Sequence, residues 1–432
     1  MSYILQNGRV VLGKRLVTMD IRVADGRISA MGVHLPVGTE DRVLECTGKV
    51  VTPGLVDLHV HLRDPGATAK ETIGTGTMAA AHGGFTTVGA MPNVTPVPDD
   101  ADSVAALRGR NCREGHVRVY QYASITRNRA AGQLVDFDAV AQAGAFAVSN
   151  DGSGIQDAAT MYAAMRGAAK AGLPLAAHVE DDGLKNGGVL NAGPRAQALG
   201  VPGVYHVVET AQLARDLALA QATGVHYHVC HVLTATGVDL IRRAKAAGVN
   251  VTAEVTPHHL LLTDNDIPDG PDAVNYKMNP PLRTMRDQQA LIAGLLDGTI
   301  DCIATDHAPH TAAEKAQGLL RAPNGIVGSE TAFSTLYTRL VRGQDAPFTL
   351  TQLVRWMSSA PAAAFGLPVG QLVPGAAADL SVFDVEHPYT VKAADFYSRG
   401  HNSPFLGWTV YGATVATIVA GKLVYAREGV QA

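Results

Sequence analysis

The stretch Val56–Gly66, VDLHVHLRDPG, places polar side chains on alternate positions of what otherwise reads as a buried β-strand. Because alternate residues of a strand share one face, we expect Asp57, His59, His61 and Arg63 to project together. Two imidazoles on one face suit a transition metal such as zinc, and an arginine beside them suits an anionic ligand. A pair of hydrogen-bonded core histidines would be the simpler explanation of this motif alone, so the rest of the chain must decide.

The same stretch is the first of eight β-like runs that alternate with helix-like segments. The runs are residues 55–61, 85–91, 117–124, 145–151, 174–180, 227–232, 251–257 and 301–309, and clear helical patterns cover 70–84, 160–172, 209–224, 237–248 and 285–298. Eight strands, each followed by a helix or a long loop, predict a (β/α)₈ TIM-like barrel. An open doubly wound sheet is the alternative, but no GxGxxG follows the first strand and the count of eight favours closure.

Both ends of the chain have a different texture, with short strands and turn signals. Asn7-Gly8 and Asp25-Gly26 predict hairpin turns near the start, and residues 378–391 and 410–429 repeat the β-rich pattern. We therefore expect residues 1–52 and 366–432 to form one small composite β domain, with the barrel at 53–365.

The composition is that of an ordinary globular enzyme, with 47% hydrophobic and 17% charged residues in 432. The net charge is −4 and no Lys/Arg cluster is present, so neither nucleic acid nor a membrane is expected as a partner. The first residues lack the apolar run of a signal peptide or membrane span. Four scattered cysteines in apolar contexts predict reduced thiols and a cytoplasmic location.

Side chains that bind metals recur at the carboxyl ends of the expected strands, where the active sites of such barrels gather. They are His59 and His61 on the first run, Asp151 on the fourth, His178 on the fifth, His231 on the sixth and Asp306 on the eighth, while Asn93 follows the second. Ordinary buried polar groups would scatter along the strands instead. Because one ion would leave some of these ligands idle, we expect two ions that share a bridging ligand. Imidazole and carboxylate ligands allow zinc, cobalt or manganese.

Alternation also separates neighbouring histidines. If His231 points into the barrel, His226 and His228 lie on the opposite face, and we expect them to point toward the helices in structural roles. The same argument separates Asp306 from His307. The segment Ala308–Gly328 has no firm secondary-structure pattern, and a loop of that length predicts a lid or a binding loop.

A set of longer motifs covers the barrel nearly from end to end. They are VDLHVHLRDPG, GGFTTVGAMPN, SNDGSG, AAHVED, YHVCHV, AEVTPHHLLLT, YKMNPPLR, DGTIDCIATDHAPH, EKAQ and GIVGSETAF. In these motifs the chain resembles the class I bacterial dihydroorotases of the amidohydrolase superfamily. Single motifs are shared with hydantoinases and allantoinases, but the combination is close to diagnostic.

The resemblance implies a zinc-dependent, reversible cyclisation of N-carbamoyl-L-aspartate to (S)-dihydroorotate and water, in de novo pyrimidine biosynthesis. It implies two zinc ions per subunit, bridged by Asp151 and a hydroxide. It assigns His59, His61 and Asp306 to one zinc, His178 and His231 to the other, and the role of general acid and base to Asp306. The implied substrate-binding residues are His61, Arg63, Asn93, Asn279, His310, Asn324 and Gly325, with Arg63, Asn93 and His310 holding the carboxylate of a small anionic substrate.

One frequent feature of this superfamily is missing from the chain, and three positions depart from the residues that are usual there. Many relatives bridge the two ions with a carboxylated lysine, whereas residues 145–154 contain none, so a carboxylate must serve here. Asn324 replaces a common phenylalanine, Asn150 a common aspartate and Ala90 a frequent proline.

Hydantoinase or allantoinase activity, and a catalytically silent scaffold for aspartate carbamoyltransferase, are the competing functions. A homodimer and physical association of an active enzyme with aspartate carbamoyltransferase stay open.

Overall fold

A computed structural model describes residues 2–39 and 41–428 of the chain. Eight parallel strands form one sheet in the order β15-β14-β13-β10-β9-β8-β7-β6. Their bounds are β6 Leu55–Val60, β7 Phe85–Ala90, β8 Arg118–Ala123, β9 Ala147–Ser149, β10 Leu175–Ala177, β13 Tyr227–Val229, β14 Val251–Val255 and β15 Cys302–Ile303. The sheet closes because Val60 and His307 form a parallel bridge and the His61 N–H donates to the His307 carbonyl over 2.9 Å. The predicted (β/α)₈ barrel is confirmed.

Helices surround the barrel, and most begin with a side-chain cap. The longer ones are α1 Ile73–His82, α2 Ala101–Glu114, α4 Ala158–Ala171, α7 Val207–Thr223, α8 Ala235–Ala246, α10 Met285–Asp297 and α14 Leu350–Met357. The shorter ones are α3 Phe137–Gln142, α5 Asp182–Lys185, α6 Pro194–Ala198, α9 Pro257–Leu261, α11 Ala312–Lys315, α12 Gly318–Arg321, α13 Ala332–Leu336 and α15 Ser359–Ala364. In α4 the buried residues Met161, Ala164, Met165 and Ala168 follow the spacing of one helix face, which explains why this segment packs as a helix. α11 and α12 lie within Ala308–Gly328, so this segment is partly helical rather than an irregular loop.

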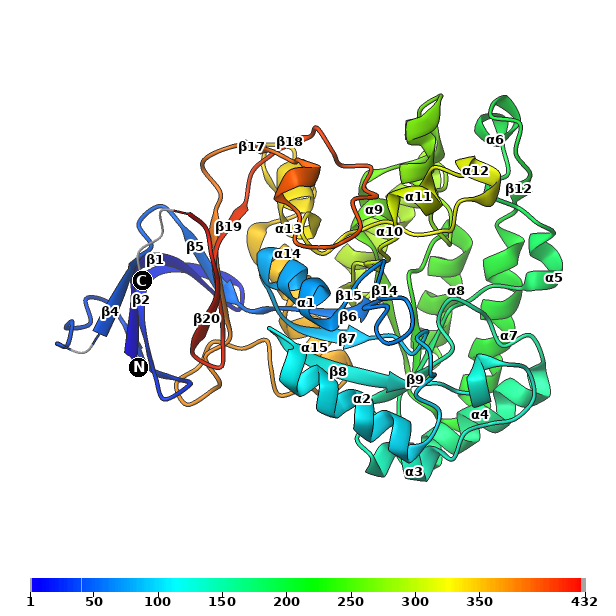
Figure 1. The fold of residues 1–432 in the computed structure, drawn as a ribbon, viewed down its shortest axis with the longest axis horizontal. Coiled ribbons are helices and arrows are strands. Elements are labelled where there is room, and N and C mark those ends of the chain that lie inside the picture. The colour runs from blue at the N-terminus through cyan, green and yellow to red at the C-terminus, as the bar shows by residue number, and fades with distance from the viewer. Residues whose placement is uncertain (1, 40, 429–432) are drawn as a thin grey trace.

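The terminal strands form a second sheet beside the barrel, at the left of Figure 1. Its strands are β1 Ser2–Leu12, β2 Arg15–Ala24, β3 Arg27–Gly32, β4 Asp41–Glu45, β5 Val50–Pro53, β16 Leu380–Asp384, β19 Ala413–Val419 and β20 Lys422–Ala426. Two short pairs lie outside this sheet, β11 Leu190–Asn191 with β12 Gly203–Val204 and β17 Tyr389–Thr390 with β18 Thr409–Val410. The order β20-β19-β16-β5-β1-β2-β3, with β4 beside β1, joins the two ends of the chain as predicted.

One of the two predicted hairpin turns is wrong. Asp25-Gly26 connects β2 to β3, with positive φ at both residues. Asn7-Gly8 instead lies inside β1, where the pairing register with β2 shifts. Asn7 has a φ of 59°, and its N–H donates to Asp20 Oδ1 over 2.8 Å, so the dipeptide forms a bulge rather than a turn.

A second bulge lies in β6 and decides which side chains face the barrel interior. Its register with β7 shifts between Asp57 and Val60, because Asp57 pairs with Val88 and Val60 pairs with Ala90. Asp57 therefore does not join the histidines as expected. Its carboxylate accepts hydrogen bonds from the Thr305 N–H (2.9 Å) and hydroxyl (2.5 Å).

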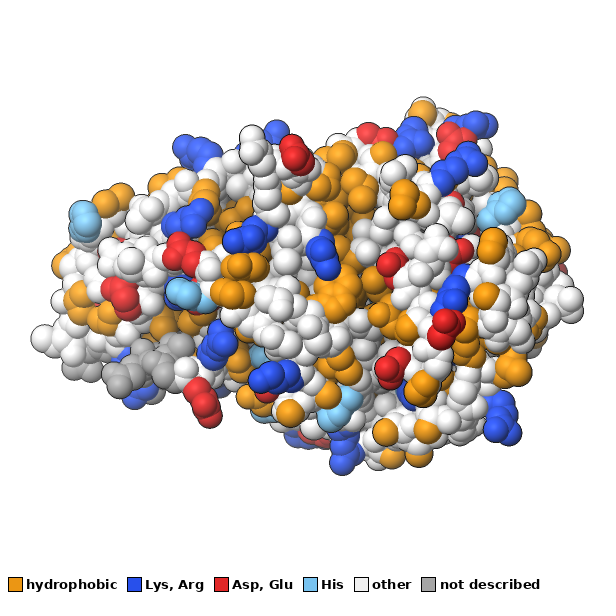
Figure 2. Space-filling view, turned by 90° about the horizontal axis from the view of Figure 1, so that it is seen from above, with side chains coloured by type: hydrophobic (Ala, Val, Ile, Leu, Met, Phe, Trp, Pro, Cys, Tyr) orange, Lys and Arg blue, Asp and Glu red, His pale blue; other side chains and the backbone are white. Residues whose placement is uncertain are grey.

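Acidic and basic side chains are interspersed over the face seen in Figure 2. Apolar side chains gather toward the centre of that view. Among the described residues, no helix is both long enough and apolar enough to cross a membrane.

Candidate metal centre

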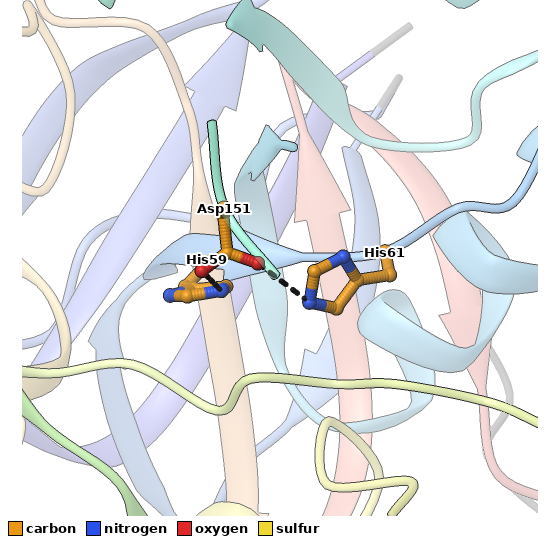
Figure 3. Close-up of side chains that lie close together, drawn as sticks. All are labelled: His59, His61 and Asp151. Carbon is orange, nitrogen blue, oxygen red and sulfur yellow. Dashed lines mark ion pairs between the residues drawn. The ribbon is translucent and has the colours of Figure 1, made fainter. Parts of the chain in front are cut away.

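Six side chains from five barrel strands converge at one end of the barrel, and Asp151 lies at their centre. Its Oδ1 lies 3.3 Å from His59 Nε2 and its Oδ2 lies 3.4 Å from His61 Nε2 (Figure 3). On the other side, Oδ1 lies 3.5 Å from both His178 Nδ1 and His231 Nε2. One carboxylate thus stands between two pairs of histidines.

Asp306 completes the first group from the end of β15. Its Oδ1 lies 2.9 Å from His61 Nε2 and 3.4 Å from His59 Nε2. The ligand atoms of His59, His61 and Asp151 form one compact set, and those of Asp151, His178 and His231 form a second. All six expected ligands are therefore brought together, in two sets that share Asp151.

Hydrogen bonds on the outer side of two imidazoles fix which nitrogen faces the centre. His59 Nδ1 lies 2.7 Å from Glu254 Oε1, so Nδ1 donates its proton there and Nε2 is the nitrogen that faces the centre. His61 Nδ1 lies 2.8 Å from Asn93 Oδ1 and is oriented in the same way. The sequence analysis did not identify Glu254. A glutamate inside an otherwise apolar strand could have indicated it, because a buried carboxylate needs a partner.

The arrangement fits a bound cation. Within the described part of the chain, His59 Nε2 and Asp151 Oδ1 are buried atoms without a hydrogen-bond partner. Buried polar atoms nearly always have one, so these two are placed for a ligand that accepts lone pairs. Nitrogen and carboxylate donors in sets of three are the chemistry of a zinc-type site.

The charges in this cluster favour ionised carboxylates. Although burial alone raises the pKa of Asp151 and of Asp306, the surrounding histidines hold both pKa values below their ordinary range. Burial alone lowers the pKa of His59, yet the negative charges of Asp151, Glu254 and Asp306 raise it well above normal. A concentration of negative charge that draws in protons would equally draw in metal cations.

Three residues at this end have left-handed backbone conformations, which simple alternation along a strand cannot predict. The φ angles are 58° at Arg63, 35° at His231 and 49° at Asp306. Such conformations are costly for residues with side chains and cluster at functional sites.

The expected orientation of His226 and His228 is wrong for this reason. His228 Nε2 lies 3.1 Å from Glu254 Oε2, in the barrel interior beneath the ligand cluster, and His226 Nε2 contacts the Thr252 hydroxyl over 2.7 Å. β13 ends at Val229, and the backbone turn at His231 lets that side chain enter the same interior from an odd position. Among the described residues, neither His226 nor His228 belongs to a group that could hold a metal.

A cavity of about 180 Å³ opens beside the ligand cluster. The lining includes every residue expected to bind substrate, namely His61, Arg63, Asn93, Asn279, His310, Asn324 and Gly325, together with Asp151, His178 and Asp306. The predicted substrate-binding residues therefore share this cavity with four of the six predicted metal ligands, His61, Asp151, His178 and Asp306.

Arg63 supplies the cavity's positive charge. In the described chain its Nε is buried without a hydrogen-bond partner, and its Nη2 lies 3.5 Å from His310 Nε2. Burial lowers the pKa of Arg63 to about 10, so the side chain stays charged at neutral pH. The neighbouring Asp64 pairs with Arg110 over 2.8 Å, so a local Arg63–Asp64 ion pair does not explain the arginine.

His310 is buried rather than a surface residue, and it lies between two cations. Its Nε2 donates to the Asn324 carbonyl over 2.8 Å, and its Nδ1 lies 3.4 Å from Lys70 Nζ. Burial, together with Arg63 and Lys70, lowers the pKa of His310 to about 3, so the imidazole is neutral. Lys70 is thus a donor that fixes the tautomer of His310, and the sequence analysis did not identify it either.

Two of the unusual residues have a structural account. Asn150 points away from the ligand cluster, accepting from the Ile125 N–H over 2.9 Å and donating to the Thr126 hydroxyl over 2.7 Å. Asn324 is exposed at the cavity, so the change from an aromatic residue leaves no hole in the core. Gly325 cannot be replaced easily: its φ is 131°, and a Cβ would lie 2.7 Å from Ala308 Cβ.

Comparison with known proteins agrees with this architecture. A family model described as Dihydro-orotase-like matches residues 48–236. The solved L-hydantoinase (dihydropyrimidinase) from Arthrobacter aurescens superposes with a TM-score of 0.87 at 26% identity, covering 100% of this chain and 97% of that one. A solved D-hydantoinase gives the same TM-score of 0.87 at 23% identity, covering 100% and 96%, and shows the shared fold alone.

These likenesses, with the barrel, define the class as hydrolases of the amidohydrolase type. The dihydroorotase of Lactiplantibacillus plantarum is 59% identical over 431 residues, covering 99% of both chains, and that of Lactobacillus helveticus is 55% identical over 428 residues with the same coverage. The chain belongs to the dihydroorotase family.

Proposed function

We propose that this protein is an active, zinc-dependent dihydroorotase that interconverts N-carbamoyl-L-aspartate and (S)-dihydroorotate in pyrimidine biosynthesis. The observation that carries the proposal is a cavity that four of the six expected metal ligands, His61, Asp151, His178 and Asp306, line together with Arg63, whose buried Nε has no hydrogen-bond partner among the described residues. A substrate with both a ring amide and a free carboxylate matches that combination.

The residues that would hold two zinc ions follow from the two ligand sets. His59, His61 and Asp306 would bind one ion, His178 and His231 the other, and Asp151 both, consistent with its position between them. When bound, such ions lower the pKa of a shared water and polarise a carbonyl oxygen.

Asp306 is the residue we assign to proton transfer in ring opening. It would take a proton from the attacking water and deliver it to the ring nitrogen as the C–N bond breaks; in ring closure the direction reverses. Its carboxylate is ionised at neutral pH, because its pKa lies below the ordinary range, so it would enter ring opening without a proton and able to accept one.

Substrate orientation would come from the other side of the cavity. Arg63, Asn93 and His310 would hold the carboxylate, and His61, itself one of the expected ligands, lines the same cavity with its Nδ1 2.8 Å from Asn93 Oδ1. Asn279 and the backbone of Asn324–Gly325 would hold the ureide part of the ring.

Hydantoinase or allantoinase activity is the second candidate, and the fold shared with solved hydantoinases favours testing it. Those rings carry no free carboxylate, so they would leave Arg63 without an ionic partner. A silent scaffold for aspartate carbamoyltransferase is a weaker candidate, because all six expected ligands converge. Physical association with that enzyme, a homodimer and a cytoplasmic location stay predictions.

The test is an assay of purified protein with L-dihydroorotate, hydantoin and allantoin, with metal content measured on the same sample. We expect turnover of dihydroorotate that a chelator abolishes and zinc restores. Arg63→Gln should lose most of the preference for dihydroorotate while retaining metal. Turnover of the uncharged rings alone would contradict the proposal, and inactivity on all three with metal bound would favour the scaffold.

A further inference from the structure

The short segment Ala322–Gly325, which contributes the Asn324–Gly325 wall of the cavity, is held in an unusual way. Side chains hydrogen-bond to all four of its carbonyl groups. The donors are Lys277 Nζ to Ala322 (2.6 Å), Lys315 Nζ to Pro323 (3.2 Å), His310 Nε2 to Asn324 (2.8 Å), and Lys315 Nζ and Asn402 Nδ2 to Gly325 (3.1 and 3.0 Å). These hydrogen bonds hold the segment in place where Asn324 and Gly325 line the cavity.

Lys315 is the centre of this arrangement. It is only 4% exposed, and its ammonium also donates to the Lys277 carbonyl over 3.3 Å. That same carbonyl accepts the Gly325 N–H over 3.0 Å. Lys315 therefore connects the Asn324–Gly325 wall to the strand-like segment that leads, two residues later, to Asn279.

Like Lys315, Lys277 is buried, and its ammonium donates to a backbone carbonyl of the segment, that of Ala322. It is 5% exposed, and among the described residues neither its ammonium nor that of Lys315 forms an ion pair with a carboxylate. Burying an ammonium costs free energy unless its donors are satisfied, so two such groups side by side need a reason. Burial, with Lys277 close by, lowers the pKa of Lys315 to about 7, which agrees with an ammonium supported by carbonyl dipoles alone.

We propose that Lys315, assisted by Lys277, is a positioning residue for substrate: it fixes the backbone of Ala322–Gly325 so that the Asn324 N–H faces the cavity as a hydrogen-bond donor. This inference rests on the proposed function. Neither lysine touches the metal-binding residues, so its effect belongs to substrate binding rather than to metal binding. Among the described residues, the Asn324 N–H donates to no backbone carbonyl, which agrees with its being available to a ligand.

The test compares the zinc-loaded wild type with Lys315→Met, Lys277→Met and, as a control, the exposed Lys170→Met, whose ammonium pairs with Asp138. We expect the KM for L-dihydroorotate to rise about tenfold in Lys315→Met, while kcat stays within about threefold, because the lost interactions are made in the ground state as well as in the transition state. Lys277→Met should shift KM in the same direction, and Lys315→Arg, which keeps the charge and donors, should lie closer to wild type.

A second measurement does not depend on activity. Hydrogen exchange in a peptide covering residues 316–328 should be faster in Lys315→Met than in wild type, and unchanged in Lys170→Met. An unaltered KM in Lys315→Met, or unaltered exchange of this peptide, would overturn the inference, and so would loss of zinc in step with activity. A wild-type enzyme that does not open dihydroorotate would instead refute the proposed function, and the exchange experiment would still decide whether Lys315 holds the segment.

Discussion

Asp306 has two tasks in the proposed chemistry, and its geometry allows both. Its Oδ1 is 2.9 Å from His61 Nε2, and its carboxylate lines the cavity. Its φ of 49° turns the side chain into the barrel at a position where a regular strand would direct it elsewhere. A carboxamide has the same shape but cannot accept and return a proton.

We therefore predict that Asp306→Asn lowers kcat at least about a thousandfold and leaves the barrel folded. The measurement is steady-state turnover of L-dihydroorotate, with circular dichroism to monitor folding. Asp138→Asn, an exposed change at a residue that pairs with Lys170, is the matched control. Near-normal turnover would remove Asp306 from the mechanism.

Asp151 belongs to both ligand sets, so its loss affects both metal positions. We predict that Asp151→Ala lowers bound zinc from about two ions per chain to below one, since every remaining set loses its shared ligand. Elemental analysis after gel filtration measures this directly. The exposed Asp239→Ala should keep full metal content, and unchanged zinc in Asp151→Ala would exclude the bridging role.

At the scale of the element, the order of strands could be predicted from the sequence but their faces could not. Hydrophobic runs and helix caps mark the eight strands clearly, because each run is short, apolar and followed by a helical period. Strand faces depend on bulges: β6 shifts between Asp57 and Val60, and β13 ends two residues before His231. A single extra residue reverses every later side chain, and no residue type announces it.

The residues that support the site are also invisible to local patterns. Glu254 reaches His59, Lys70 reaches His310 and Lys277 reaches Ala322 from segments that are distant in the chain. The ligands themselves could be found, because histidine and aspartate at strand ends are rare and chemically specific. Their partners are common residue types whose meaning depends on the neighbours that folding brings.

Helix α7 is tied to the loop that carries His231 by one buried carboxylate. Glu209 accepts hydrogen bonds from the Leu233 N–H (2.8 Å) and from the Thr234 N–H (3.1 Å). Burial raises the pKa of Glu209 to about 7 from an ordinary 4.5, although these hydrogen bonds oppose the shift. The folded state therefore holds this proton more tightly than the unfolded state does.

The pKa of Glu209 is higher in the folded state than in the unfolded state. Its contribution to the free energy of unfolding is therefore fully present below pH 4.5 and is lost as pH rises through 7. We predict that the free energy of unfolding of Glu209→Gln, taken relative to that of wild type, rises by about 2 to 3 kcal/mol from pH 5 to pH 8. Urea unfolding at both pH values measures the difference, and the exposed Glu386→Gln serves as control. A difference between variant and wild type that does not change with pH would contradict the prediction.

At the scale of the whole molecule, we propose that residues 53–365 form the barrel domain and that 1–52 and 366–432 form the small domain. Phe383, on β16 of the terminal sheet, stacks on Phe333 of α13 with ring centroids 3.8 Å apart. The ring fills the space above Gly84, where a Cβ would lie 2.4 Å from Phe383 Cζ. The two parts share this apolar contact rather than meeting across water.

We predict that Phe383→Ala lowers the free energy of unfolding by about 3 to 5 kcal/mol, because a fully buried aromatic ring is lost and its space is only partly refilled. Zinc content should stay the same, since no metal-binding residue contacts this ring. Denaturant unfolding provides the measurement, and the half-buried Phe396→Ala should cost less. A loss below about 1 kcal/mol would mean that the two parts hold together by other means.

The terminal sheet also sets the order in which the molecule can be completed. β5 pairs with β16 on one side and leads directly through Gly54 into β6, the first barrel strand. On the ribosome, β5 is made before the barrel, and its partner emerges only after all eight barrel strands. One edge of β5 therefore stays open throughout the synthesis of the barrel, until β16 is made and covers it.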